Sequence, residues 1–162
     1  MAVRVLVADD NEIMREGICA LLRKCDGIEV VGQAVDGRMA VAMASKMRPD
    51  LMIIDVEMPN LNGIEATRQM IGLQPNLKVM ALSAHAEGDL VAKMIKAGAR
   101  GYMHKASAFS ELKEGIRMML EGETFLCSRI SEVSFSNCVN MILNPIMSET
   151  DELQLFYNRN IK

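Results

Sequence analysis

The sequence predicts an α/β fold in which a doubly wound sheet of five parallel strands is covered by helices on both faces and followed by a short helical tail. The first observation behind this prediction is that strand-like and helix-like segments alternate five times over about the first 120 residues. The second is that residues 51–54, LMII, form a continuously apolar run. Such a run is typical of a parallel strand that is buried on both faces.

The five predicted strands are short runs of β-branched and other apolar residues. In chain order they are 3–8 (VRVLVA), 28–34 (IEVVGQA), 51–55 (LMIID), 77–83 (LKVMALS) and 101–104 (GYMH). The helices are recognised by apolar residues that recur every three or four positions. They are predicted at about 10–24, 36–47, 63–72, 86–97 and 108–121. The second helix ends before Pro49, because the residue before a proline disfavours helical geometry.

The composition fits a soluble protein with one hydrophobic core. The chain has 162 residues, 50% of them hydrophobic, and its formal net charge of −3 gives no sign of a nucleic-acid-binding surface. No apolar run approaches the roughly 18 residues of a membrane span, and the N-terminus does not resemble a signal peptide. The four cysteines lack C-x-x-C spacing, which argues against a zinc site or a disulfide framework and favours a cytoplasmic location.

Polar side chains stand directly after four of the five predicted strands. They are Asp9 and Asp10 after the first, Asp55 after the third, Ser83 after the fourth and Lys105 after the fifth. Ligands of doubly wound sheets bind beyond the carboxyl ends of the strands, at the point where the strand order reverses. We therefore expect these five residues to form one site.

The residue types of this set point to phosphoryl transfer. Asp9, Asp10 and Asp55 would repel one another at one sheet edge, and Mg²⁺ would neutralise them because it prefers hard oxygen ligands. Lys105 would add a positive charge and Ser83 a hydroxyl donor. Together these groups could stabilise a phosphoryl group on its way to the Asp55 carboxylate, which would become an acyl phosphate.

Each residue also has a purely structural interpretation. Asp9 and Asp10 could serve merely as caps of the helix that follows them, and Asp55 could serve merely as the start of a turn. The two histidines, His85 and His104, are interpreted as incidental to catalysis. The joint occurrence of polar residues at four strand ends, in the expected order, favours the functional interpretation.

Four motifs are shared with a known family. They are Asp9-Asp10, DVEMPNLNG at 55–63, Ser83-Ala84 and GYMHKA at 101–106. In these motifs the chain resembles the receiver domain of bacterial two-component response regulators, whose fold is flavodoxin-like or CheY-like, (βα)5. The segment GARGYMHKASAFSELKEGIRMMLEGE is similar to the NarL/FixJ class of these proteins. One departure is Ala106, because a proline follows the lysine in many receivers.

The resemblance implies two-component signal transduction, with a sensor histidine kinase as the partner. It identifies Asp55 as the phosphoacceptor and implies no enzymatic activity beyond self-phosphorylation and autodephosphorylation. It also implies a Mg²⁺ cofactor bound by the side chains of Asp10 and Asp55 and by the main-chain carbonyl of Glu57, with Asp9 acting through water.

The remaining roles implied by the resemblance concern the response to phosphorylation. Lys105 would contact the phosphoryl group. Ser83 would be the switch hydroxyl that moves toward the phosphate, and Tyr102 the switch aromatic that follows it. The two residues would thereby bias the surface formed by the fourth helix, the fifth strand and the fifth helix.

The resemblance divides the chain into a receiver domain at 1–123 and a second segment at 124–162, which would be a linker with a truncated or diverged output segment. Helices are expected in the second segment near 129–143 and 148–157. Members of the NarL/FixJ class usually end in a helix-turn-helix domain. The second segment is short for such a domain and carries more acidic than basic residues, so DNA binding by this chain alone is not expected.

Two other function classes stay open beside the receiver. A phosphatase resembling the haloacid dehalogenases would require an Asp-x-Asp motif after the first strand, whereas Asp9 and Asp10 are adjacent here. A transcription regulator would need a C-terminal helix-turn-helix, which is incomplete here. A phosphorylation-dependent homodimer is a further expectation, because members of the class commonly dimerise.

Overall fold

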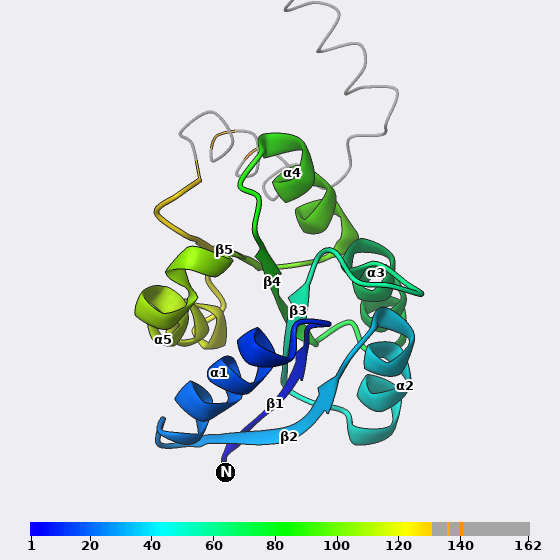
Figure 1. Ribbon diagram of the computed structural model, residues 1–162, viewed down its shortest axis with the longest axis vertical. Coiled ribbons are helices and arrows are strands. Elements are labelled where there is room, and N and C mark those ends of the chain that lie inside the picture. The colour runs from blue at the N-terminus through cyan, green and yellow to red at the C-terminus, as the bar shows by residue number, and fades with distance from the viewer. Residues whose placement is uncertain (131–135, 137–139, 141–162) are drawn as a thin grey trace, which may run out of the picture.

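A central parallel sheet organises the protein in the computed structural model, which describes residues 1–130, 136 and 140 (Figure 1). Its six strands are β1 (Val3–Ala8), β2 (Ile28–Ala34), β3 (Leu51–Asp55), β4 (Lys78–Ser83), β5 (Gly101–His104) and β6 (Phe125–Leu126). The helices of the described residues up to 130 are α1 (Glu12–Arg23), α2 (Gly37–Met47), α3 (Gly63–Leu73), α4 (Gly88–Ala97) and α5 (Ala108–Leu120). The predicted α/β fold with alternating strands and helices is confirmed.

The strand order places the ends of β1 and β3 side by side. Across the sheet the order is β2-β1-β3-β4-β5-β6, and every neighbouring pair is parallel. The chain moves outward from β1 to β2 and then returns to the other side of β1, so the order reverses between β1 and β3. Because Ala8 pairs with Ile54, the residues that follow these two, Asp9 and Asp55, emerge at the same edge of the sheet.

Helices cover both faces of the sheet, as Figure 1 shows. On one face α1 and α5 pack against each other, and on the other α2, α3 and α4 form a row. Alternate residues of the central strands enter the two cores: Val5 and Ile53 face α1 and α5, while Leu6 and Ile54 face the three-helix row. All four are fully buried, which explains why the central strands read as continuous apolar runs.

The first three helices begin at side-chain caps. The side-chain oxygens of Asn11, Asp36 and Asn62 accept hydrogen bonds from backbone N–H groups three residues further on, at 3.0, 2.8 and 2.9 Å. Each cap satisfies one of the N–H groups that a helix start leaves unpaired. These caps fix where α1, α2 and α3 begin, directly after the loops that leave the carboxyl ends of β1, β2 and β3.

The edge of the sheet beyond β5 differs from the prediction of five strands. Residues Phe125 and Leu126 form β6, which pairs with Gly101 and Tyr102 of β5. A two-residue strand gives no periodic pattern, so only its pairing reveals it. The sheet therefore extends past the boundary predicted at residue 123.

Two further details complete the fold. A single 3₁₀ turn, η1, covers Lys105–Ser107 between β5 and α5 and was not predicted. The helix predicted at 148–157 lies outside the described residues, as does most of the one predicted at 129–143. None of the helices in the described part of the chain has the length and apolar composition needed to cross a bilayer.

Candidate functional site

Asp55 lies at the centre of the site, at the end of β3. Its carboxylate is buried, and its Oδ2 atom lies 3.0 Å from the Nζ atom of Lys105. The backbone N–H of Glu57 donates a hydrogen bond of 3.2 Å to its Oδ1 atom. The loop after β3 turns back over the strand end, where a Cβ atom on Gly63 would lie 2.2 Å from the carbonyl oxygen of Asp55. The glycine that ends the DVEMPNLNG motif is therefore required by this close approach.

Asp9 is the second buried carboxylate of the site. Its Oδ1 atom accepts a hydrogen bond of 2.9 Å from the backbone N–H of Asn11, and its Oδ2 atom lies 3.0 Å from Lys105 Nζ. The guanidinium of Arg15 donates to the main-chain carbonyl of Asp9 at 2.8 Å and is itself oriented by Gln33. The role of Arg15 is not recognisable from the sequence, because an arginine in an amphipathic helix gives no signal that it turns inward.

The three carboxylates of the site can bind a metal ion. Oxygen atoms of Asp9, Asp10 and Asp55 all lie within 4.8 Å of one another. The Oδ2 atom of Asp9 is buried and accepts no hydrogen bond of good geometry, although Lys105 Nζ is close to it. A buried carboxylate oxygen with spare acceptor capacity beside two further carboxylates fits a hard divalent cation such as Mg²⁺. The main-chain carbonyl of Glu57 stays a prediction as a fourth ligand.

Burial perturbs the ionisation of the site. Loss of hydration raises the pKa of Asp55 to about 7, and the negative charge of Asp9 adds to the effect, while Lys105 opposes it. Burial also opposes the charged form of Lys105, but its hydrogen bonds to Asp9 and Asp55 outweigh this and raise its pKa. The site thus holds one ammonium between two carboxylates, and a proton competes for Asp55 near neutral pH.

The predicted switch residues meet at the loop between β4 and α4. The hydroxyl of Ser83 accepts a hydrogen bond of 3.0 Å from the backbone N–H of His85. The hydroxyl of the fully buried Tyr102 donates to the carbonyl of the same residue at 2.8 Å. Burial raises the pKa of Tyr102 to about 12, so the ring is a neutral donor here. The structure therefore ties Ser83 and Tyr102 to one residue of this loop rather than to Asp55.

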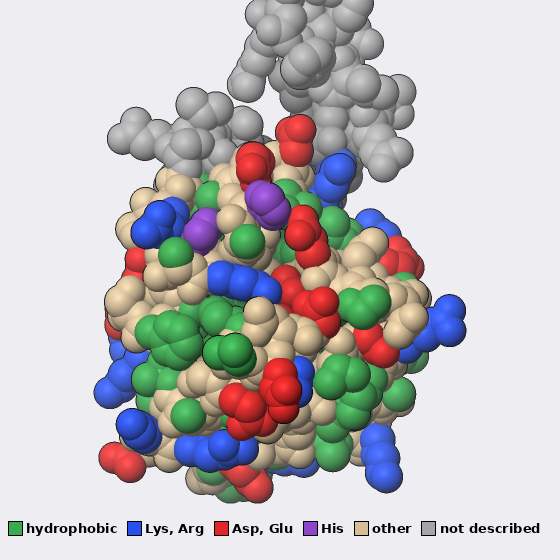
Figure 2. Space-filling model, viewed as in Figure 1, with side chains coloured by type: hydrophobic (Ala, Val, Ile, Leu, Met, Phe, Trp, Pro, Cys, Tyr) green, Lys and Arg blue, Asp and Glu red, His purple; other side chains and the backbone are tan. Residues whose placement is uncertain are grey.

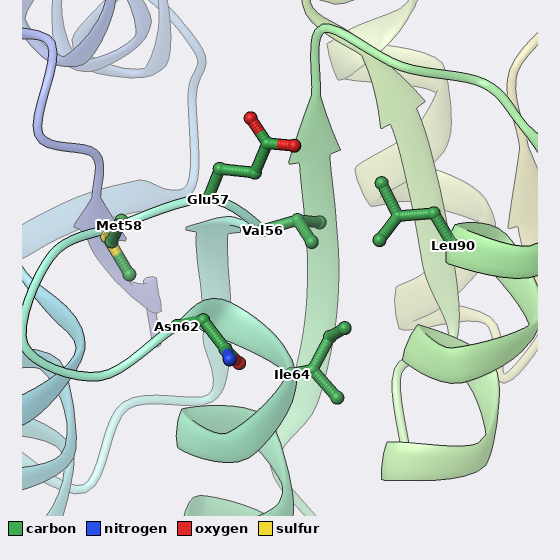
Figure 3. Close-up of a pocket in the computed structure, with 6 residues that line it drawn as sticks. All are labelled: Val56, Glu57, Met58, Asn62, Ile64 and Leu90. Carbon is green, nitrogen blue, oxygen red and sulfur yellow. The ribbon is translucent and has the colours of Figure 1, made fainter.

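His85 also links the loops on the two sides of the site. Its Nε2 atom lies 3.6 Å from a carboxylate oxygen of Glu57, and its Nδ1 atom lies 3.5 Å from one of Glu87. The face in Figure 2 carries the two histidines of the chain above a cluster of acidic side chains with a basic one beside it. A shallow groove of about 470 Å³ adjoins this site, and Figure 3 shows its walls. The groove is lined by Val56, Glu57, Met58, Asn62, Ile64 and Leu90.

Comparison with known proteins identifies the class to which this fold and site belong. The family model described as the response regulator receiver domain matches residues 5–117, which include all the predicted site residues. The chain belongs to this family. Residues 5–117 are the receiver domain of a response regulator of two-component signal transduction.

Individual relatives are similar to most of the chain. The response regulator GacA of Pseudomonas viridiflava is 35% identical over 153 residues, which cover 92% of this chain and 72% of GacA. The response regulator UvrY of Escherichia coli K12 is 36% identical over 130 residues, which cover 80% of this chain and 60% of UvrY. The chain therefore matches between 60% and 72% of the length of these relatives.

Solved structures show the same fold. The signal receiver domain of the putative response regulator NarL from Mycobacterium tuberculosis has a TM-score of 0.72 and 30% identity, covering 75% of this chain and 98% of that domain. A two-component response regulator of the LuxR family from Aurantimonas sp. SI85-9A1 has a TM-score of 0.76 and 27% identity, covering 88% of this chain and 99% of that one. The predicted resemblance to the receiver domain and to the NarL/FixJ class is confirmed.

Proposed function

We propose that this receiver accepts a phosphoryl group on Asp55 from a sensor histidine kinase and passes the signal on through a change of its surface. The observation that supports this most directly is the placement of the Asp55 carboxylate beside the ammonium of Lys105 and the carboxylates of Asp9 and Asp10. That arrangement offers a nucleophile, a fixed positive charge and a cation site at one edge of the sheet.

In the proposed transfer an oxygen of the Asp55 carboxylate attacks the phosphorus atom of the donor. The bond between phosphorus and the donor atom breaks as the new phosphorus–oxygen bond forms, and its electron pair leaves with the donor, such as a histidine imidazole. The N–H of Glu57 orients the carboxylate by its hydrogen bond to Oδ1. Lys105, within 3.0 Å of Oδ2, would counter the negative charge of the incoming group.

We assign the cation site to Mg²⁺. Asp10 and Asp55 would bind it by their side chains, Glu57 by its main-chain carbonyl and Asp9 through water. When bound, the ion would supply positive charge to the phosphoryl oxygens and hold Asp55 in its ionised form. This second effect matters because burial raises the pKa of Asp55 to about 7.

Phosphorylation would act on the loop after β4. The phosphoryl group adds charge and acceptor oxygens, for which the Ser83 hydroxyl is a suitable donor. Ser83 would then exchange its contact with His85 for one with the phosphoryl group, and the loop would move. Because Tyr102 is hydrogen-bonded to the same His85, β5 would follow, and with it the surface of α4, β5 and α5.

The proposal includes no separate substrate. Self-phosphorylation and autodephosphorylation would be the only reactions, and the change of the α4-β5-α5 surface would be the output. A homodimer that forms on phosphorylation is part of the same proposal, and light scattering with and without a phosphodonor tests it.

Intact mass after incubation with acetyl phosphate and Mg²⁺ tests the proposal. Wild type should gain about 80 Da, the mass of one phosphoryl group, and Asp55→Ala should gain nothing. Asp26→Ala is a matched control, because Asp26 is exposed in the turn between α1 and β2. A gain that persists in Asp55→Ala would overturn the assignment, and turnover of a phosphate ester would favour the phosphatase alternative.

A further inference from the structure

Two hydrogen bonds of His104 bracket Lys105. The Nδ1 atom of its ring accepts a hydrogen bond of 3.0 Å from the backbone N–H of Ala106, the residue after the lysine. Its own backbone N–H donates to the Sγ atom of Cys127 at 3.2 Å. The carbonyl of Lys105 accepts a further bond from the N–H of Ala108. The peptide unit that follows Lys105 is therefore held at both its N–H and its carbonyl, and the one that precedes His104 is held at its N–H.

These hydrogen bonds matter because Lys105 has a long side chain. Its Nζ atom lies 3.0 Å from one oxygen of Asp9 and 3.0 Å from one oxygen of Asp55. A lysine side chain has four rotatable carbon–carbon bonds and loses up to roughly 2 kcal/mol of rotamer freedom when it is fixed. The ammonium can be held between the two carboxylates only if the backbone that carries it stays in place.

We propose that His104 is a positioning residue for Lys105, and thus for the phosphoryl transfer, because its imidazole caps the 3₁₀ turn that starts at the lysine. This inference rests on the proposed function. The N-cap of a helical turn accepts a hydrogen bond from a backbone N–H two or three residues on, a task that serine, threonine, aspartate and asparagine usually perform. Here the ring nitrogen performs it, with His104 in extended geometry at φ −74° and ψ 135°.

The partner of the cap depends on the residue at 106. Ala106 has the backbone N–H that the His104 ring binds, whereas a proline would lack it. The bond also requires a neutral ring with its proton on Nε2, because Nδ1 must offer its lone pair. His104 and Ala106 therefore act as a pair, in which the ring of one binds the backbone N–H of the other.

The hydrogen bond of the His104 ring can be removed without disturbing the strand pairing of the sheet. The backbone of β5 at His104 pairs with Ser83 of β4, and β6 extends the sheet beyond β5. Neither pairing involves the imidazole. Loss of the ring nitrogen should leave the fold intact and loosen only the turn that carries Lys105.

The experiment compares three substitutions at one position. His104→Asn keeps a side-chain acceptor for the Ala106 N–H, His104→Phe keeps a ring without an acceptor, and His104→Ala lacks both. The rate of phosphorylation by acetyl phosphate with Mg²⁺ is followed by intact mass, and the thermal midpoint is measured alongside. A cap of this kind stabilises the turn by a free energy that corresponds to a factor of roughly three to ten in an equilibrium constant. Phosphorylation of His104→Phe and of His104→Ala should therefore be slower than that of wild type by about this factor. His104→Asn should stay close to wild type.

Each pattern of rates decides the inference. Slow His104→Phe and His104→Ala with a restored His104→Asn support it. Equal rates in all four proteins, or equally slow rates in all three variants, overturn it and leave Asp55 as the phosphoacceptor. If His104→Phe does not fold, His104→Ala provides the same comparison. Wild type that gains no mass overturns the proposed function itself, and this inference with it.

Discussion

Two clusters of this protein share one combination of charges, a cation between two carboxylates, but lie in opposite surroundings. In the first, Lys105 lies 3.0 Å from Asp9 and 3.0 Å from Asp55 at the sheet edge. In the second, Arg117 on α5 lies 2.6 Å from Glu114 and 2.7 Å from Glu121. The carboxylates of the first cluster are at most 4% exposed, whereas those of the second are more than half exposed.

The surroundings decide what each cluster does. In the second cluster, the hydrogen bond from Arg117 lowers the pKa of Glu114. Because water solvates these groups, their contacts contribute little to stability. In the first cluster, loss of hydration raises the pKa of Asp55 to about 7, which leaves the site dependent on protons and cations. The same combination of charges forms two ordinary ion pairs on the surface of a helix in one place and a candidate reaction centre in the other.

Lys105→Met should give the largest effect on stability. It leaves Asp9 and Asp55 adjacent and buried without their cation, which costs about 3 kcal/mol at pH 8 without Mg²⁺. The loss should shrink at pH 5, because Asp55 can then take up a proton. Urea unfolding at both pH values measures it, and a loss that is equal at the two would contradict the proposed origin.

Asp55→Asn should give the second largest effect on stability, and it should stabilise the protein in alkaline solution. The folded-state pKa of about 7 lies above the value of about 3.9 for a free aspartate, so folding binds a proton between these pH values. Stability in wild type therefore falls from about pH 4 to about pH 7 on account of this group. Asp55→Asn lacks this fall and should melt several degrees higher than wild type at pH 8. Melting curves from pH 5 to pH 8, without divalent cations, test the slope.

Mg²⁺ should stabilise the wild type by a smaller amount. At ten times its dissociation constant the ion adds about 1.4 kcal/mol to the free energy of unfolding, because it binds only the folded site. Asp10→Ala should remove most of this gain in stability. Asp26→Ala should keep it, because Asp26 is exposed in the turn between α1 and β2 and is not part of the cluster. Melting in MgCl₂ and in EDTA measures the difference, and an unchanged gain in Asp10→Ala would exclude this cluster as the binding site.

Arg117→Met should give the smallest effect. It breaks both contacts of the exposed cluster, but water and salt screen them already. Stability should change by close to the error of a urea titration, and phosphorylation should match wild type. A loss as large as that of Lys105→Met would show that burial is not what separates the two clusters.

Much of the fold and the site could be predicted because both follow from local patterns. The apolar run that became β3 had to be buried on both faces, and parallel strands place their carboxyl ends at one edge. Asp9, Asp10, Asp55 and Lys105 therefore had to meet there, and they do. The sixth strand was missed because its two residues take their geometry from β5 alone.

Other features of the site could not be predicted from local sequence. Nothing near Arg15 indicates that its guanidinium turns inward to the carbonyl of Asp9. The two histidines were interpreted as incidental, yet His85 contacts Glu57 and Glu87 in two loops, and the ring of His104 binds the backbone beside Lys105. These contacts depend on side-chain directions that only the packed loops set.

The sequence by itself determined which elements form, in what order, and which charges stand at the carboxyl ends of the strands, because hydrophobic periodicity and chain connectivity decide these. Only the tertiary structure decided how those charges behave. Burial of Asp55 beside Asp9 raises its pKa, Lys105 is fixed between the two, and the same combination of charges on α5 stays ordinary because water reaches it. Hydration is a property of the assembled surface, which no local stretch of sequence contains.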